Sequence, residues 1–225
     1  MNDRTQNRAS LPTNASGGLA ETRDVTLDKE LEAHIDAMRG TVDGSSKLIA
    51  DIAHGIRTCF EAGGKLLICG NGGSAADAQH FAAEFVNHLR FDRPGLPAIA
   101  LSTDTSILTA VANDRRYEDV FARQVEALGS SGDVLIALST SGASQNVLIA
   151  LDTARRLGLV TIGFTGEAGA DRMSERCDLV LVAASTDTAR IQECHEFVYH
   201  VVAGMVEQDL FGDLASEKIE RARSR

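Results

Sequence analysis

The sequence lacks several features that would assign a protein to a class at once. It contains no uninterrupted apolar run near the roughly 20 residues that a membrane span requires, and its first residues lack the apolar core of a signal peptide. Its four cysteines form no Cys-x-x-Cys pair. We therefore expect buried thiols in a reducing compartment, by default the cytoplasm, and neither a disulfide framework nor a zinc knuckle. No membrane partner is expected.

An excess of positive charge is also missing. Lys and Arg number 22 against 32 Asp and Glu, which leaves a formal net charge of −10. Because an acidic chain repels phosphate backbones, we expect no nucleic-acid partner. Loop amides can still bind the phosphate of a small molecule locally. The 44% of hydrophobic residues suffice for a real core, and the length of 225 residues favours one domain.

The first 24 residues are polar and show no apolar period, which predicts a disordered arm (1–24) before a single domain (25–225). Helical periodicity starts at residue 27, is interrupted at Gly40, and returns before "AGG" at 62–64 ends it. Two N-terminal helices are therefore expected.

Short apolar runs then alternate with helical stretches. The predicted strands are 65–69, 97–101, 133–138, 160–164 and 178–182. The predicted helices are 74–90, 106–112, 117–128, 143–157, 169–176 and 188–211. Most of the runs are apolar at successive positions, which is typical of parallel strands covered on both faces. The pattern predicts an α/β fold with a doubly wound, five-stranded parallel sheet preceded by two helices.

Two predicted strands end in loops of small polar residues, "GNGGSAA" after 65–69 and "STSGASQN" after 133–138. In an open parallel sheet, ligands bind beyond the carboxyl ends of the strands, where the strand order reverses. Both loops lead directly into a predicted helix, and a helix N-terminus attracts anions. The two loops are therefore candidate binding sites.

The second loop is the better candidate for a phosphate. It offers the hydroxyl groups of Ser139, Thr140, Ser141 and Ser144, and Gly142 permits a tight turn. It has no lysine and does not match the Walker pattern, which argues against a nucleoside triphosphate with magnesium. A phosphate monoester on a small molecule fits better. The alternative is that these residues only cap the following helix.

The first loop formally matches G-x-G-x-x-A through Gly70, Gly72 and Ala75. A dinucleotide fold also needs an acidic residue at the end of the next strand, about 20 residues further on. Asp104 lies well beyond that distance, and the extra Gly73 disturbs the turn. The sequence therefore argues against dinucleotide binding.

Potential metal ligands lie on two predicted helices. His80 and Glu84 are four residues apart and share a helix face, while Gln192 and His200 on the last helix are roughly 12 Å apart along its axis. Two imidazoles, a carboxylate and an amide oxygen form a zinc-like ligand set. The alternatives are structural pairs, His80 with Glu84 and His200 with Glu196. For His195 we expect a surface or interface position.

Four motifs occur in order between about residues 30 and 211: "GNGGSAADAQHFAAE", "LTAVANDRRYEDVFARQVEALG", "STSGASQNV" and "ARIQECHEFVYH". Together they resemble the sugar isomerase (SIS) domain, specifically the phosphoheptose isomerases. The resemblance implies a flavodoxin-like fold, a homotetramer with sites between subunits, and one zinc ion per subunit. It also implies conversion of sedoheptulose 7-phosphate to glycero-manno-heptose 7-phosphate, an early step toward the heptose of surface polysaccharide.

The same resemblance implies roles for individual residues. The substrate contacts would be Asn71, Gly72, Gly73, Glu84, Asn113, Asp114, Ser139, Thr140, Ser141, Ser144 and Gln192. The metal ligands would be His80, Glu84, Gln192 and His200. Glu84 and His200 would act as the catalytic acid/base pair. This chain departs from some members at Ala189, where they have Asp before the "RIQE" motif.

Two other functions remain open from the sequence. A regulatory SIS relative binds a replication initiator protein, but it lacks a histidine at the position of His200, which favours an enzyme here. An isomerase of another phosphosugar is the second alternative, because a phosphate loop does not read the length of a sugar chain.

Overall fold

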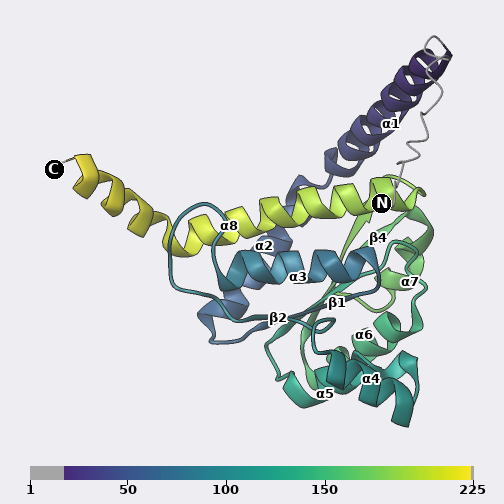
Figure 1. Cartoon of the computed structure of the whole chain (residues 1–225). Helices are drawn as coiled ribbons and strands as arrows, with labels where there is room; N and C mark the ends of the chain where they lie inside the picture. The colour runs from purple at the N-terminus through teal and green to yellow at the C-terminus, as the bar shows by residue number, and fades with distance from the viewer. Residues whose placement is uncertain (1–17, 224–225) are drawn as a thin grey trace, which may run out of the picture.

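The computed structural model describes the backbone of residues 18–223 and the side chains of residues 26–214. Within that range, five strands form one parallel sheet in the order β2-β1-β3-β4-β5 (Figure 1). The strands are β1 Leu66–Gly70, β2 Ala98–Ala100, β3 Val134–Leu138, β4 Val160–Gly166 and β5 Leu179–Ala183. The predicted flavodoxin-like sheet is confirmed, and each strand lies within two residues of its prediction.

Helices cover both faces of the sheet. One face is packed by α2 (Ser46–Glu61), α3 (Gly73–Val86) and α8 (Thr188–Arg223), and the other by α4 (Thr105–Asp114), α5 (Ala122–Leu128), α6 (Gln145–Leu157) and α7 (Ala170–Ser174). Neighbouring residues of a strand belong to opposite clusters: Leu66 packs with the first set of helices and Leu67 with the second. This double burial explains the unbroken apolar strands, because alternate side chains face opposite layers.

The ends of the chain differ from the prediction. Helix α1 spans Gly18–Val42, so residues 18–24 of the predicted arm are helical, and residues 1–17 lie outside the described residues. Leu19, Ala20, Glu21 and Arg23 are good helix formers, which accounts for the earlier start. Gly40 does not break α1; a Cβ atom there would lie 2.8 Å from Cβ of Ala184. The glycine instead permits close packing of α1 on the segment after β5.

Helix α3 ends four residues before the predicted position. The Arg93 guanidinium donates to the carbonyl oxygens of Glu84 at 2.7 Å and Phe85 at 2.8 Å, and the Leu96 amide also donates to Phe85. These bonds satisfy the last carbonyls of the helix, so the chain turns away. Arg93 is itself held by the buried carboxylate of Glu207 on α8, with Nε 3.1 Å from Oε1.

Two smaller differences concern the segments beside the second helical layer. The predicted helix 117–128 is divided into a 3-10 turn, Tyr117–Asp119, and α5, because Val120 and Phe121 turn into the core. A second 3-10 turn, Glu167–Gly169, precedes α7. Among the described residues, no helix combines the length and apolarity needed to cross a bilayer.

Candidate active site

The strand order reverses between β1 and β3, and both polar loops lie at this point. Gly70 at the end of β1 is paired in register with Leu138 at the end of β3, so the loops that follow are neighbours. Gly72 has φ 57°, a left-handed conformation that favours glycine. A Cβ atom on Gly73 would lie 2.2 Å from Nε2 of Gln192. The first loop therefore turns tightly and lets α8 approach closely.

A polar pocket of about 270 Å³ opens between the two loops and the start of α8. Its lining residues are Asn71, Gly73, Ser74, Leu138, Ser139, Thr140, Ser144, Thr188 and Gln192. The predicted sugar loop, phosphate loop and Gln192 are thus brought together. Ser139 donates to the Ser144 hydroxyl at 3.3 Å. Although Ser144 occupies the N-cap position of α6, its side chain makes no cap hydrogen bond. This observation weakens the capping alternative.

Of the residues with predicted substrate contacts, Gly72 and Glu84 do not line this pocket, and three more lie exposed elsewhere in this chain. Ser141 is exposed, and its hydroxyl accepts a hydrogen bond from the Ala143 amide at 3.3 Å. Asn113 and Asp114 lie at the exposed end of α4, where their side chains bind each other at 2.8 Å. None of the three lines the pocket. Their contact with a substrate stays a prediction.

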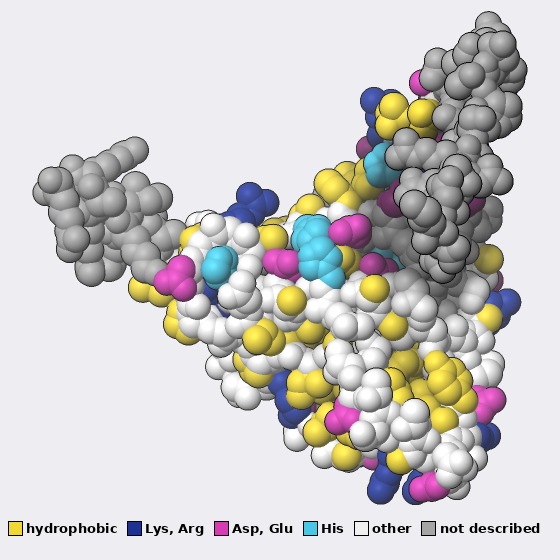
Figure 2. Space-filling view, viewed as in Figure 1, with side chains coloured by type: hydrophobic (Ala, Val, Ile, Leu, Met, Phe, Trp, Pro, Cys, Tyr) yellow, Lys and Arg dark blue, Asp and Glu magenta, His cyan; other side chains and the backbone are white. Residues whose placement is uncertain are grey.

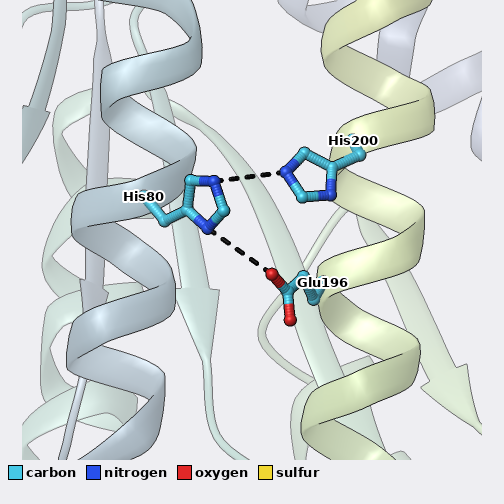
Figure 3. Close-up of side chains that lie close together, drawn as sticks. All are labelled: His80, Glu196 and His200. Atoms are coloured by element: carbon cyan, nitrogen blue, oxygen red, sulfur yellow. Dashed lines mark hydrogen bonds and ion pairs between the residues drawn. The ribbon is translucent and has the colours of Figure 1, made fainter. Parts of the chain in front are cut away.

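A histidine cluster lies further along the same two helices, α3 and α8 (Figure 3). Nε2 of His80 is 3.3 Å from Nε2 of His200 and 3.1 Å from Oε1 of Glu84. On the opposite edge of the ring, Nδ1 is 2.8 Å from the Tyr199 hydroxyl and 3.6 Å from Oε1 of Glu196. His80 and His200 therefore come together within one chain, a point that the sequence left open.

The donor set suits a zinc ion. Two ligands of a tetrahedral zinc lie about 3.3 Å apart at normal bond lengths, and both short contacts of His80 Nε2 are close to that spacing. Among the described residues, His80, Glu196 and His200 form a group whose ligand atoms all lie within 4.8 Å of one another. Glu196 was not a predicted ligand. Gln192, which was, lies against Gly73 at the pocket end of α8.

Sequence reasoning missed several residues around the cluster. Glu196 was considered only as a partner for His200, and Tyr199 was not singled out, yet both contact His80. The position of Asp77 one turn before His80 is evident from the sequence, but its unpartnered, buried Oδ2 atom is not. Burial, and then the nearby charge of Glu196, raise the pKa of Asp77 to about 6. The spacing 196, 199 and 200 along one helix was the available signal, since such residues can share a neighbour.

The expected surface position of His195 is wrong. Its side chain is fully buried, with the ring edge-on to Phe164 and Nε2 3.3 Å from the carbonyl oxygen of Thr165. Burial lowers the pKa of His195 to about 4. His200, five positions further along α8 and part of the cluster, is instead partly exposed. Five positions, about 1.4 turns of helix, separate the buried histidine from the histidine of the cluster.

Helices α3 and α8 run side by side and join the pocket to the cluster (Figure 1). Gly73 meets Gln192 at one end, and His80 meets His200 at the other. Seven positions along α3 correspond to about 10 Å. Figure 2 shows histidine side chains beside acidic ones on the surface along α8. The polar pocket and the histidine–carboxylate cluster thus lie along the same pair of helices.

Residues 31–166 match the family model described as SIS domain. The phosphoheptose isomerase of Roseiflexus sp. is 56% identical over 182 residues, which cover 81% of this chain and 92% of that protein. The chain belongs to the SIS-domain phosphoheptose isomerase family. A phosphoheptose isomerase of Burkholderia pseudomallei is 49% identical over 85% of this chain and 98% of its own length.

Solved structures of family members agree with this fold. The phosphoheptose isomerase structure from Francisella tularensis superposes with a TM-score of 0.78 at 37% identity, over 81% of this chain and 97% of that one. The structure from Neisseria gonorrhoeae gives 0.76 at 38% identity, over 84% and 99%. The similarity therefore spans almost the full length of both relatives.

The departure from some family members at Ala189 has a local structural context. Asp187, two positions earlier, accepts hydrogen bonds from the amides of Ala189 at 2.8 Å and Arg190 at 3.3 Å. This carboxylate satisfies free amides at the start of α8. The first turn of α8, which brings Thr188 and Gln192 to the pocket, is thus fixed by an acidic residue from outside the motif.

Proposed function

We propose that the protein is a phosphoheptose isomerase that converts sedoheptulose 7-phosphate to D-glycero-D-manno-heptose 7-phosphate. The observation that carries the proposal is the seam between α3 and α8, which joins a polar pocket to a cluster of two histidines and two glutamates. The hydroxyls of Ser139, Thr140 and Ser144 would bind the phosphate. The reacting carbons would lie at the histidine cluster.

The reaction needs two kinds of proton transfer. A ketose becomes an aldose through an enediol when a proton leaves C1 and one is added at C2, while a proton passes between the oxygens on C1 and C2. Glu84, with a side chain only 13% exposed beside His80, is our candidate for the carbon-bound proton. His200 would move the proton between the oxygens. A paired base and acid of this kind is what the enediol route demands.

The bound phosphate would provide remote binding energy that positions the reacting carbons. We propose that His80, Glu84, Gln192 and His200 hold one zinc ion per subunit; Gln192 would reach the ion from the pocket end of the seam, whereas Glu196 lies beside the other ring nitrogen of His80. Such an ion would polarise the substrate carbonyl and stabilise the negative charge that develops on its oxygen. The match between the two short His80 contacts and zinc ligand spacing supports this assignment.

We also propose a homotetramer with sites between subunits. Phe197 and Met205 are 42% and 36% exposed, and they lie on α8 on either side of the half-exposed Val201. These apolar side chains lie on the helix that carries His200, and a second copy of the chain would cover them. Asn113 and Asp114 do not line the pocket of their own chain, which agrees with a site completed by another subunit. Light scattering coupled to size exclusion would test the assembly.

We also propose that residues 25–225 form a single domain. The product of the reaction would supply heptose for surface polysaccharide. The four cysteines are free, three of them buried, which supports the cytoplasm as the compartment. The alternatives, a regulatory module and an isomerase of another phosphosugar, lack a specific observation in their favour. The relatives named above are phosphoheptose isomerases.

The deciding experiment is an isomerase assay with sedoheptulose 7-phosphate and added zinc, with a Glu84→Gln variant beside the wild type. We expect turnover by the wild type and loss of at least about a hundredfold in kcat for the variant, since a positioned base contributes that much. Circular dichroism should show the same fold in both. If the wild type does not turn over sedoheptulose 7-phosphate but does turn over a shorter sugar phosphate, the substrate assignment is wrong and the shorter sugar takes its place. Wild-type-like turnover by Glu84→Gln would remove Glu84 from the mechanism.

A further inference from the structure

Three side chains from different parts of the chain meet at the first loop. Asn71 and Asn146 form a reciprocal amide pair: Nδ2 of Asn71 donates to Oδ1 of Asn146 at 2.9 Å, and Nδ2 of Asn146 donates to Oδ1 of Asn71 at 2.8 Å. The hydroxyl of Tyr117 donates to the same Oδ1 of Asn71 at 3.1 Å. Tyr117 and Asn146, which are 46 and 75 positions away from Asn71 in the sequence, thus contact the same side-chain amide.

The three residues differ in burial. Asn146 is only 3% exposed and lies in the first turn of α6, directly after the phosphate loop. Asn71 is half-buried and lines the pocket, whereas Tyr117 is 58% exposed at the entrance of the 3-10 turn. A buried amide that is fully paired with another amide is held in one orientation, because rotation would leave both polar groups unsatisfied.

The hydrogen-bonding capacity of Asn71 is almost used up. An amide oxygen has two lone pairs and an amide nitrogen two hydrogens. Asn146 and Tyr117 occupy both lone pairs, and Asn146 takes one of the two hydrogens. Asn71 therefore keeps one N–H donor and no acceptor for a ligand in the pocket.

We propose that Asn146 and Tyr117 are positioning residues that hold Asn71 in one orientation, so that it presents a single N–H donor to a sugar oxygen. The identity of the ligand as a sugar rests on the proposed isomerase function, whereas the hydrogen bonds that hold Asn71 do not depend on that proposal. The pair also ties the sugar loop after β1 to α6, the helix that carries the phosphate loop. When the phosphate of a substrate is bound by the phosphate loop, the N–H group of Asn71 would therefore lie at a fixed distance from it along the sugar.

Kinetics of Asn146→Ala and Tyr117→Phe test the proposal. Loss of the amide pair should lower kcat/KM about tenfold to a hundredfold, as expected when a contact is misplaced. Loss of one hydroxyl should lower kcat/KM about threefold to tenfold. The inhibition constant of inorganic phosphate should stay within about twofold in both variants, because the hydroxyls of the phosphate loop remain. Wild-type kcat/KM in Asn146→Ala would overturn the proposal.

A double-mutant cycle separates positioning from general damage. If Asn146 acts through Asn71, adding Asn146→Ala to an Asn71→Ala variant should change kcat/KM less than about twofold. Gln124→Ala is the matched control, since Gln124 is also a buried amide with two hydrogen bonds, to the carbonyls of Leu101 and Val120. It should lose stability but keep kcat/KM. Full additivity of the Asn71 and Asn146 changes would overturn the proposal.

A measurement without turnover keeps this inference distinct from the proposed function. In the nitrogen–proton spectrum of the wild-type protein, one side-chain amide proton of Asn71 should exchange slowly with water. Asn146→Ala should make it exchange quickly, while the Gln124→Ala spectrum keeps it slow. Fast exchange already in the wild type would overturn the positioning role. If the amide proton exchanges slowly but sedoheptulose 7-phosphate is not turned over, the substrate assignment is wrong and the positioning of Asn71 by Asn146 still holds.

Discussion

The Nε2 atom of His80 on α3 lies 3.3 Å from the Nε2 atom of His200 on α8. Two imidazole nitrogens at this distance repel each other when both present lone pairs, so a proton or a metal ion must lie between them. The carboxylate of Glu84 beside the same nitrogen favours a positive occupant. A metal ion bound between the two nitrogens would lie at the part of the seam where the proposed chemistry occurs.

Tyr199→Phe should weaken zinc binding about tenfold to a hundredfold, as is typical when a partner of a metal ligand is removed. The Tyr199 hydroxyl lies 2.8 Å from Nδ1 of His80, and its ring is stacked on Phe81 with centroids 4.9 Å apart. Burial, and then the nearby charge of Glu196, raise the pKa of the Tyr199 hydroxyl above its usual value, so the hydroxyl stays neutral. It can accept a hydrogen bond from Nδ1–H and leave Nε2 free for the ion.

Competition with a chelator of known affinity measures this change directly. His34→Ala is the control, because His34 bonds Glu193 outside the cluster and should leave zinc affinity unchanged. Equal affinities of wild type and Tyr199→Phe would show that packing alone orients His80.

Ser144→Ala should raise KM for the phosphosugar about fivefold to tenfold, whereas Ser141→Ala should have a smaller effect. Ser144 lines the pocket and makes no cap bond, so its loss removes a contact worth about 1 kcal/mol or more to a charged group. Ser141 is exposed and already bonded to the Ala143 amide. Steady-state kinetics of the two variants measures both KM values. A larger rise in KM for Ser141→Ala than for Ser144→Ala would place the phosphate on the outer side of the loop.

The sheet and the two polar loops at its strand ends were predictable from the sequence, but the contacts among the residues of the candidate site were only partly predictable. Unbroken apolar strands and a helix period are local signals, and they located β1 to β5 within two residues. Asn146 could not be found in this way, because its importance depends on a contact with Asn71, 75 positions away in the sequence. The early end of α3 likewise depends on Arg93, which reaches back to the helix from the next loop. Long-range pairing carries no periodic signal.

Glu207→Gln should destabilise the protein by about 3–5 kcal/mol, the usual cost of leaving a buried charge without its partner. The side chains of Arg93 and Glu207 are each 1% exposed, and Glu207 also accepts the amides of Leu89 and Arg90. Glu126→Gln breaks an exposed pair with Arg123 and should cost no more than about 1 kcal/mol. Urea unfolding at equal protein concentration compares them. A cost below about 1 kcal/mol for Glu207→Gln would mean that the amide replaces the carboxylate fully.

His195 should make stability depend on pH between about 4 and 6.5. Burial lowers the pKa of His195 to about 4 in the folded protein, whereas a free histidine titrates near 6.5. Below pH 6.5 the unfolded chain therefore takes up a proton that the folded protein does not. The contribution of neutral His195 is complete above pH 6.5 and is lost as the pH falls toward 4. At most it amounts to about 3 kcal/mol.

A His195→Gln variant isolates this effect. Asp77 titrates in an overlapping range with the opposite sign, because its pKa is raised to about 6 and its protonated form is favoured in the folded protein. Since the variant keeps Asp77, that contribution cancels in the difference between the two proteins. We expect the unfolding free energy of the wild type to fall more steeply than that of the variant as the pH is lowered from 6.5 to 4. Parallel curves over this range would show that His195 is protonated in the core.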